Sequence, residues 1–141
     1  METAERTKPK DTLCAILVLT SNKIKRGNGT NEVIFNANHH DLQRIFHEIS
    51  GGFEILKPFA HSDVPPIAHW SSTLEEAFGE LRIAGLINRY DIQNPSLFVI
   101  TKSGEKYAKE LRLTLGEFEE INEIAEQLVF RIPTTVKRGD V

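Results

Sequence analysis

Cysteine and long apolar runs are scarce in this sequence, and each scarcity excludes a class of protein. Cys14 is the only cysteine, so an intramolecular disulfide is excluded and a reducing compartment is favoured. The apolar run at residues 13–19 is too short to cross a bilayer. The acidic, polar residues before it do not form the basic start of a signal peptide. We therefore expect a cytoplasmic protein with no membrane partner.

The chain also lacks the excess of cations that would attract nucleic acid over its whole surface. Its net charge is −3 and its isoelectric point is about 6.0. Residues 71–130 contain six Lys or Arg against eleven Asp or Glu, which gives a local net charge of −5. Any contact with phosphate would need a local basic surface.

Motifs for catalysis and metal binding are lacking as well. The sequence contains no nucleophile elbow, no Walker or Rossmann glycine loop and no His-Glu-x-x-His motif. The histidines do not have the spacing of zinc ligands, and we interpret them as solvated or core-edge side chains. They are His39, His40, His47, His61 and His69. We expect a protein that is not an enzyme and that needs no cofactor and no metal.

The length and the hydrophobic content fit one domain. A chain of 141 residues with 40% hydrophobic residues can build a proper core. We expect a polar tail at residues 1–10, one domain at 11–133 and a second tail at 134–141. Within the domain, the apolar run at 13–20 fits a buried helix or a strand, and we favour the helix, with Cys14 as a buried small hydrophobe.

The next part of the chain predicts a basic loop, a helix and an extended segment. Residues 23–30, KIKRGNGT, read as a basic loop with a tight turn at Asn28-Gly29. A helix with Asn38 as its N-cap follows and ends at Gly51-Gly52, and residues 53–59 are expected to be extended. The apolar side chains of this helix have helical spacing: Leu42, Ile45, Phe46 and Ile49.

Residues 72–111 carry the most informative pattern, which predicts a helix, an antiparallel hairpin and a second helix. Ser72 and Glu75 have the spacing of a capping box. The strands are expected at residues 86–92 and 97–101, with Asn94-Pro95 as the turn. Thr101 or Ser103 can cap the second helix. The apolar stripe of the first helix comprises Leu74, Ala77, Phe78, Leu81, Ala84 and Gly85.

Two stretches of this segment resemble the winged helix-turn-helix superfamily, in particular the MarR-like and PadR-like small regulators. LRIAGLI at residues 81–87 resembles the end of their recognition helix. FVITKSG at 98–104 resembles the strand and the helix start after the wing. The resemblance covers about a third of the chain and implies an α+β, mostly helical winged helix with a small antiparallel β-hairpin and a C-terminal helix. That pattern has a short helix ahead of Ser72, where the two prolines within residues 62–67 leave room for a single turn. A weaker similarity is to SocA and Panacea-type antitoxin-like domains.

The last predicted helix begins with a capping box at Thr114 and Glu117 and ends at Pro133. Its apolar face can be buried in either of two ways, on its own domain or in a homodimer. Its glutamates form a solvated side. Heptad positions are occupied by Leu111, Phe118, Ile121, Ala125, Leu128 and Ile132, and the predicted dimer interface comprises Phe118, Ile121, Ala125 and Leu128.

The function predicted first is that of a DNA-binding transcriptional regulator with double-stranded DNA as its partner. Glu75 and Glu76 would oppose phosphate at the start of the recognition helix. The alternative is therefore a non-enzymatic protein-interaction module, such as an antitoxin-like or adaptor protein, and Trp70 is either a buried anchor or a hot spot for that partner. The predicted DNA contacts are Lys23, Lys25, Arg26, Arg82 and Arg89.

Overall fold

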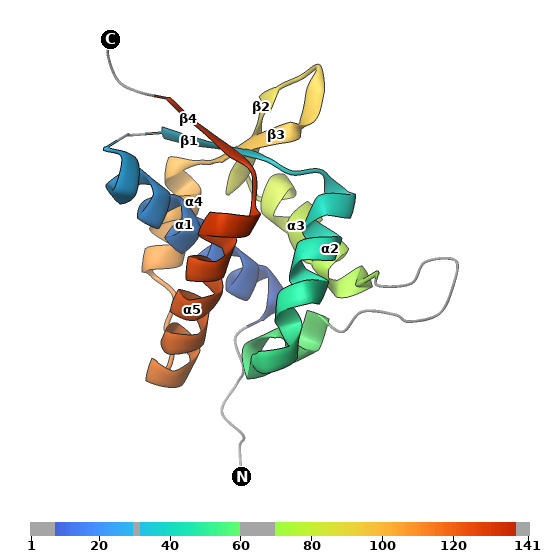
Figure 1. The fold of residues 1–141 in the computed structure, drawn as a ribbon, viewed down its shortest axis with the longest axis vertical. Helices are drawn as coiled ribbons and strands as arrows, with labels where there is room; N and C mark the ends of the chain where they lie inside the picture. Colours follow the sequence, from blue (N-terminus) through green and yellow to red (C-terminus); the bar gives the residue numbers. More distant parts are fainter. Residues whose placement is uncertain (1–7, 30–31, 60–69, 138–141) are drawn as a thin grey trace.

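The structure is a computed structural model that describes residues 8–29, 32–59 and 70–137. It has the predicted α+β fold, in which helices predominate and a small antiparallel sheet lies across one end (Figure 1). The helices are α1 (Pro9–Asn28), α2 (His39–Ile49), α3 (Ser72–Ile83), α4 (Lys102–Lys109) and α5 (Leu115–Arg131), with 3₁₀ turns η1 (Ser50–Gly52) and η2 (Glu54–Phe59). The strands are β1 (Glu32–Asn36), β2 (Ile87–Asp91), β3 (Asn94–Ile100) and β4 (Thr134–Lys137).

Helix α1 confirms the preference for a helix at residues 13–20 and is longer than expected. It continues to Asn28, so the prediction of a basic loop is wrong for residues 23–28. No glycine or proline interrupts residues 10–26, and the helix ends only where Gly29 adopts a φ of 60°. The N–H of Gly29 donates to the carbonyl of Lys25, so the Asn28-Gly29 pair closes a helix and does not form a tight turn.

The N-caps follow the sequence closely. Asn38 forms a capping box with Asp41, and Thr114 forms one with Glu117, both as predicted. Helix α3 differs by one residue, because Ser71 and not Ser72 accepts the N–H of Leu74 at 3.1 Å. The segment at 53–59 was expected to be extended and is instead largely the 3₁₀ turn η2.

The four strands are ordered β2-β3-β1-β4 and each neighbouring pair is antiparallel. The predicted hairpin is confirmed, with Ile87 opposite Ile100. Its turn lies at residues 92–93 and not at Asn94-Pro95, because Asn94 pairs with Asp91 and already belongs to β3. Strands β1 and β4 were not expected. Residues 134–137, predicted as part of a tail, instead form the edge strand β4.

The core lies between the sheet and the helices. The stacked rings of Phe35 and Phe98 have centroids 5.0 Å apart, and Phe78 packs edge-on against Phe98. These three aromatic side chains join β1, β3 and α3. Cys14 is buried as predicted, and burial raises the pKa of its thiol to about 11.

Three of the four residues predicted to form a dimer interface belong to this core. Ile121, Ala125 and Leu128 are at most 1% exposed within the single subunit. They pack where α5 lies against α1, so the alternative of packing on the same domain is correct for them. Phe118 is the exception, because about half of its surface is exposed.

Candidate nucleic-acid interface

A buried amide fixes the start of α3 against α2. The Nε2 of Gln43 donates to the carbonyl of Ser71 at 2.9 Å, and the N–H of Ser71 donates to the Oε1 of Gln43 at 2.7 Å. Both residues are buried, so neither backbone group of Ser71 has access to water as a substitute partner. The first turn of α3 therefore has one position relative to α2.

The end of α3 is tied equally closely to the hairpin and to α4. Gly85, with a φ of 74°, turns the chain from α3 toward β2. The hydroxyl of Thr101 donates to the carbonyls of Gly85 at 2.7 Å and Leu86 at 3.0 Å, and accepts the N–H of Gly104. Helix α3, the base of the hairpin and the start of α4 consequently form one unit.

An open depression lies between α3 and the first strand of this hairpin. Arg82 and Arg89 are both exposed, and both also line a smaller depression that extends to Asn38 and His39 at the start of α2. Neither guanidinium forms an ion pair with any residue in the described ranges. The larger depression is lined by Gly79, Arg82, Ile83, Ile87, Asn88 and Arg89.

Two of the three carboxylates of α3 lie close to a cationic or titratable partner outside this depression. Glu75 lies 2.7 Å from Nδ1 of His39, so its charge has a partner when the imidazole is protonated. Glu80 is close enough to Lys10, at the start of α1, for its charge to act on that ammonium. The pKa of Lys10 is raised mainly by its hydrogen bond to Tyr107, and the charges of Asp11 and Glu80 add to this rise. Glu76 is the third glutamate of α3. It is exposed, and within the described residues it neither pairs with a histidine nor acts on Lys10.

The structure separates the five residues predicted to contact DNA into two groups. Arg82 and Arg89 lie together, whereas Lys23, Lys25 and Arg26 lie on the last turns of α1. Figure 1 shows that end of α1 on the opposite side of the molecule from the β2–β3 turn. The ammonium of Lys23 is 3.6 Å from Glu126, and that of Lys25 is 2.8 Å from Glu105. The five residues therefore do not form one basic surface.

Sequence reasoning missed two residues that line these depressions together with Arg82 and Arg89. Asn88 precedes Arg89 on β2, and its position in a strand next to α3 was the available signal. His39 approaches from α2, 43 residues before Arg82 in the chain. Such a long-range approach has no local sequence signal.

Trp70 is half-buried, with its ring edge-on to His40 at a centroid distance of 6.0 Å. His61, His69 and the prolines of residues 62–67 lie outside the described residues. Within the described ranges, no group of three side chains could hold a metal ion, and no helix is long and apolar enough to span a membrane. No family model, curated protein or solved structure matches the chain.

Proposed function

We propose that this protein is a winged-helix DNA-binding regulator, in which the C-terminal half of α3 and the β2–β3 hairpin contact the duplex. The order helix, strand, helix, helix, strand, strand supports this proposal, as does the position of β1 beside β3. The observation that carries it is the pair of uncompensated guanidinium groups, Arg82 and Arg89, in one open depression between α3 and β2.

The chemistry of the depression suits a nucleic-acid backbone and a groove edge. Arginine binds phosphate or guanine through two parallel hydrogen bonds, and the amide of Asn88 adds a donor and an acceptor beside it. Ile83, which is 91% exposed, offers an apolar contact of the kind that thymine methyl groups make. Two cations imply few phosphate contacts, so we expect weak binding, with a slope of log affinity against log salt of about −2.

The proposal is tested by fluorescence anisotropy with a labelled duplex of mixed sequence at low and moderate salt. Arg82→Ala and Arg89→Ala should each weaken binding by about 5- to 150-fold, which corresponds to about 1–3 kcal/mol per contact. Arg26→Ala is the matched control, because it removes an exposed arginine from the far end of α1 and should leave the affinity unchanged. Absence of binding at low salt, or equal losses in all three variants, would refute the proposal.

A protein-interaction module is the second candidate, and one observation favours it. Ile83, Tyr90 and Ile92 are respectively 91%, 42% and 85% exposed on α3 and the hairpin. Exposed apolar and aromatic side chains next to arginine are typical of protein interfaces. A partner bound mainly through these apolar side chains would dissociate when Ile92 is replaced by Asp and would respond little to salt. DNA binding has the opposite dependence on salt.

A further inference from the structure

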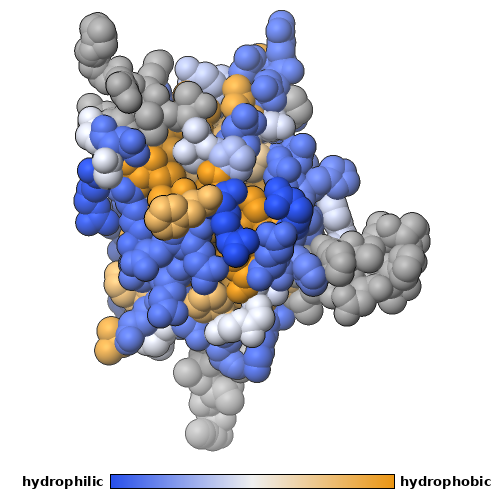
Figure 2. All heavy atoms as spheres, in the orientation of Figure 1, coloured by the Kyte–Doolittle hydropathy of each residue, from blue (hydrophilic) through white to orange (hydrophobic). Residues whose placement is uncertain are grey.

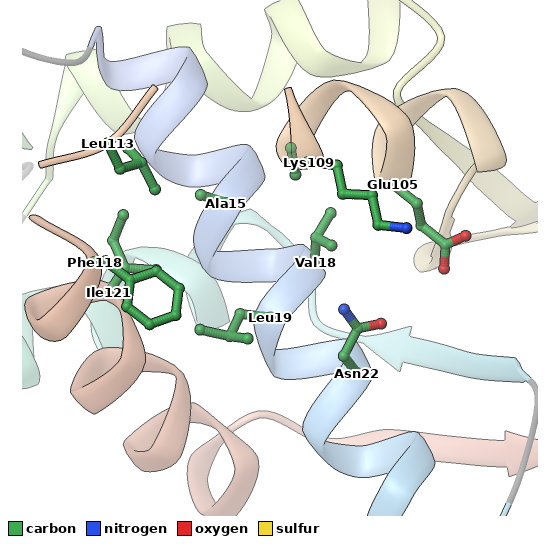
Figure 3. A pocket seen from close by; sticks show the side chains of 10 residues that line it. Ala15, Val18, Leu19, Asn22, Glu105, Lys109, Leu113, Phe118 and Ile121 are labelled. Atoms are coloured by element: carbon green, nitrogen blue, oxygen red, sulfur yellow. The ribbon is translucent and has the colours of Figure 1, made fainter. Parts of the chain in front are cut away.

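A second surface of the molecule is an apolar pocket between α1, α4 and α5, with a volume of about 350 Å³ (Figure 3). In Figure 3, Leu113, Phe118 and Ile121 lie at one end of the pocket, and Asn22, Glu105 and Lys109 lie at the other. The carboxylate of Glu105 is held by Lys25 at 2.8 Å, which leaves the ammonium of Lys109 as the uncompensated charge of the rim.

The apolar surface continues beyond the pocket onto α5. The ring of Phe118 lines the pocket and is nevertheless 49% exposed, and Leu115, one turn earlier on the same helix, is 75% exposed. Exposed large apolar side chains beside an apolar pocket are a feature of protein-binding surfaces. A small molecule inside the pocket would leave Leu115 in water, whereas a protein surface can cover both side chains.

The two helices that flank the pocket carry opposite charge. Residues 102–112, which include α4, contain four Lys or Arg against two Glu, hence +2, and Lys106, Lys109 and Arg112 form no ion pair with described residues. Helix α5 contains five Glu against one Arg, hence −4. Glu119 and Glu123 are exposed and form no ion pair within the described ranges.

We propose that a second copy of this chain covers the pocket in a two-fold symmetric dimer. A two-fold axis makes the same surface face itself, so a surface with a basic half and an acidic half is complementary to its own copy. The basic α4 of each subunit faces the acidic α5 of its partner, and Leu115 and Phe118 are buried at the centre. This interface replaces the one predicted on Ile121, Ala125 and Leu128, and it does not depend on DNA binding.

The apolar centre is tested by sedimentation velocity of the whole chain from low to high micromolar concentration. The wild type should dimerise, and Phe118→Glu should weaken dimerisation by at least about 30-fold, the effect expected of an interface hot spot. Phe130→Glu is the matched control: it introduces the same change on the same helix, about 18 Å farther along it, at a residue that does not line the pocket. It should dimerise like the wild type.

Figure 2 shows a second hydrophobic area where the sheet meets the C-terminal end of α5. Loss of the dimer in Phe130→Glu alone would place the interface there and overturn the proposal.

The charge pairing is tested with two double variants. Lys106→Glu with Lys109→Glu makes α4 acidic, and Glu119→Lys with Glu123→Lys brings the net charge of α5 from −4 to 0 and makes its two exposed, unpaired carboxylate positions cationic. Each double variant alone should be monomeric, because each places like charges across the axis. Their equimolar mixture should form heterodimers, because residues 106 and 109 of each subunit again face residues 119 and 123 of opposite charge. Circular dichroism checks that each variant is folded, so a monomeric mixture of folded variants would refute the pairing.

Two further outcomes would also overturn the proposal. One is a wild type that remains monomeric at high micromolar concentration. The other is a monomer that binds the apolar anion 1-anilinonaphthalene-8-sulfonate and loses this binding when Val18, which lines the pocket, is replaced by Trp. That result would identify a small-molecule site instead.

Discussion

Gly104 shows how closely single residues are constrained where α4 begins. A Cβ atom at this position would lie 2.2 Å from the carbonyl oxygen of Leu86 and 3.1 Å from Cγ2 of Ile100. Real Cβ atoms do not approach backbone oxygen so closely, and this oxygen also accepts hydrogen bonds from Thr101. The position therefore requires glycine for space and not for an unusual backbone angle.

We expect Gly104→Ala to lower the free energy of unfolding by about 1–3 kcal/mol, the usual cost of forcing extra volume into a packed site. Gly79→Ala serves as the control, because Gly79 lies inside α3 with nothing within 4 Å of the added Cβ. That substitution should stabilise the protein by about 0.5–1 kcal/mol. Urea unfolding measures both values. Equal effects of the two substitutions would contradict the close contact seen at Leu86.

At the scale of the elements, the pairing of Gln43 with Ser71 determines where α3 begins. Gln43→Leu keeps a side chain of similar volume but leaves the buried N–H of Ser71 without its partner, whereas the carbonyl of Ser71 still accepts the N–H of Glu75 at 3.2 Å. We expect a loss of about 1–3 kcal/mol in the free energy of unfolding, the cost of one buried donor left without a partner. Hydrogen exchange at the amide of Ser71 should also become faster than at Leu42, which remains within α2.

Arg44→Ala is the control for this prediction. Arg44 is the next residue on the same helix, and its ion pairs with Asp41 and Glu48 are exposed and 3.8 Å long. Such surface pairs contribute about 0–1 kcal/mol. If Gln43→Leu were no more destabilising than Arg44→Ala, the buried amide would not be what positions α3.

The elements that could be predicted are those defined by neighbours in the sequence. Asn38 with Asp41 and Thr114 with Glu117 specify helix starts within four residues, and both capping boxes were recognised. Strand β1 was missed because its pairing partners lie about 60 residues away on β3 and about 100 residues away on β4. Its sequence, EVIFN, is short and has no alternation long enough to identify a strand by itself.

The candidate site was predictable only in part for the same reason. Arg82 and Arg89 are seven residues apart in a helix and a strand that the sequence pattern had already joined. The basic cluster at residues 23–26 looked equally suitable in sequence, but its lysines are engaged by Glu126 and Glu105 from distant helices. Charge in a sequence does not reveal which carboxylate will lie opposite after folding.

At the scale of the whole molecule, α1 lies among three other helices and holds the fold together. It packs against α3, α4 and α5, and its side chains from Leu13 to Val18 are buried. Removal of apolar volume there should therefore weaken the helices and the sheet together, as expected for one cooperative unit.

We expect Leu17→Ala to reduce the free energy of unfolding by about 2–5 kcal/mol, because the side chain is fully buried and leaves a cavity. Ile92→Ala, at the exposed turn of the hairpin, should change it by less than about 0.5 kcal/mol. The urea transition followed by far-ultraviolet circular dichroism should coincide with that followed by the fluorescence of Trp70, the single tryptophan. Separate transitions would show that the part of the molecule around Trp70 unfolds independently.

The position of α1 also has a consequence for biosynthesis. Helix α1 is the first described element to leave the ribosome, yet α5, which covers one of its sides, ends at Arg131, and β1 gains its partner β4 only at Thr134–Lys137. At about 5–20 residues per second, the apolar side of α1 waits on the order of 5–20 s for the rest of the fold. The native arrangement therefore forms only after nearly the whole of residues 9–137 has been made, and until then the nascent chain exposes an apolar helix that chaperones can recognise.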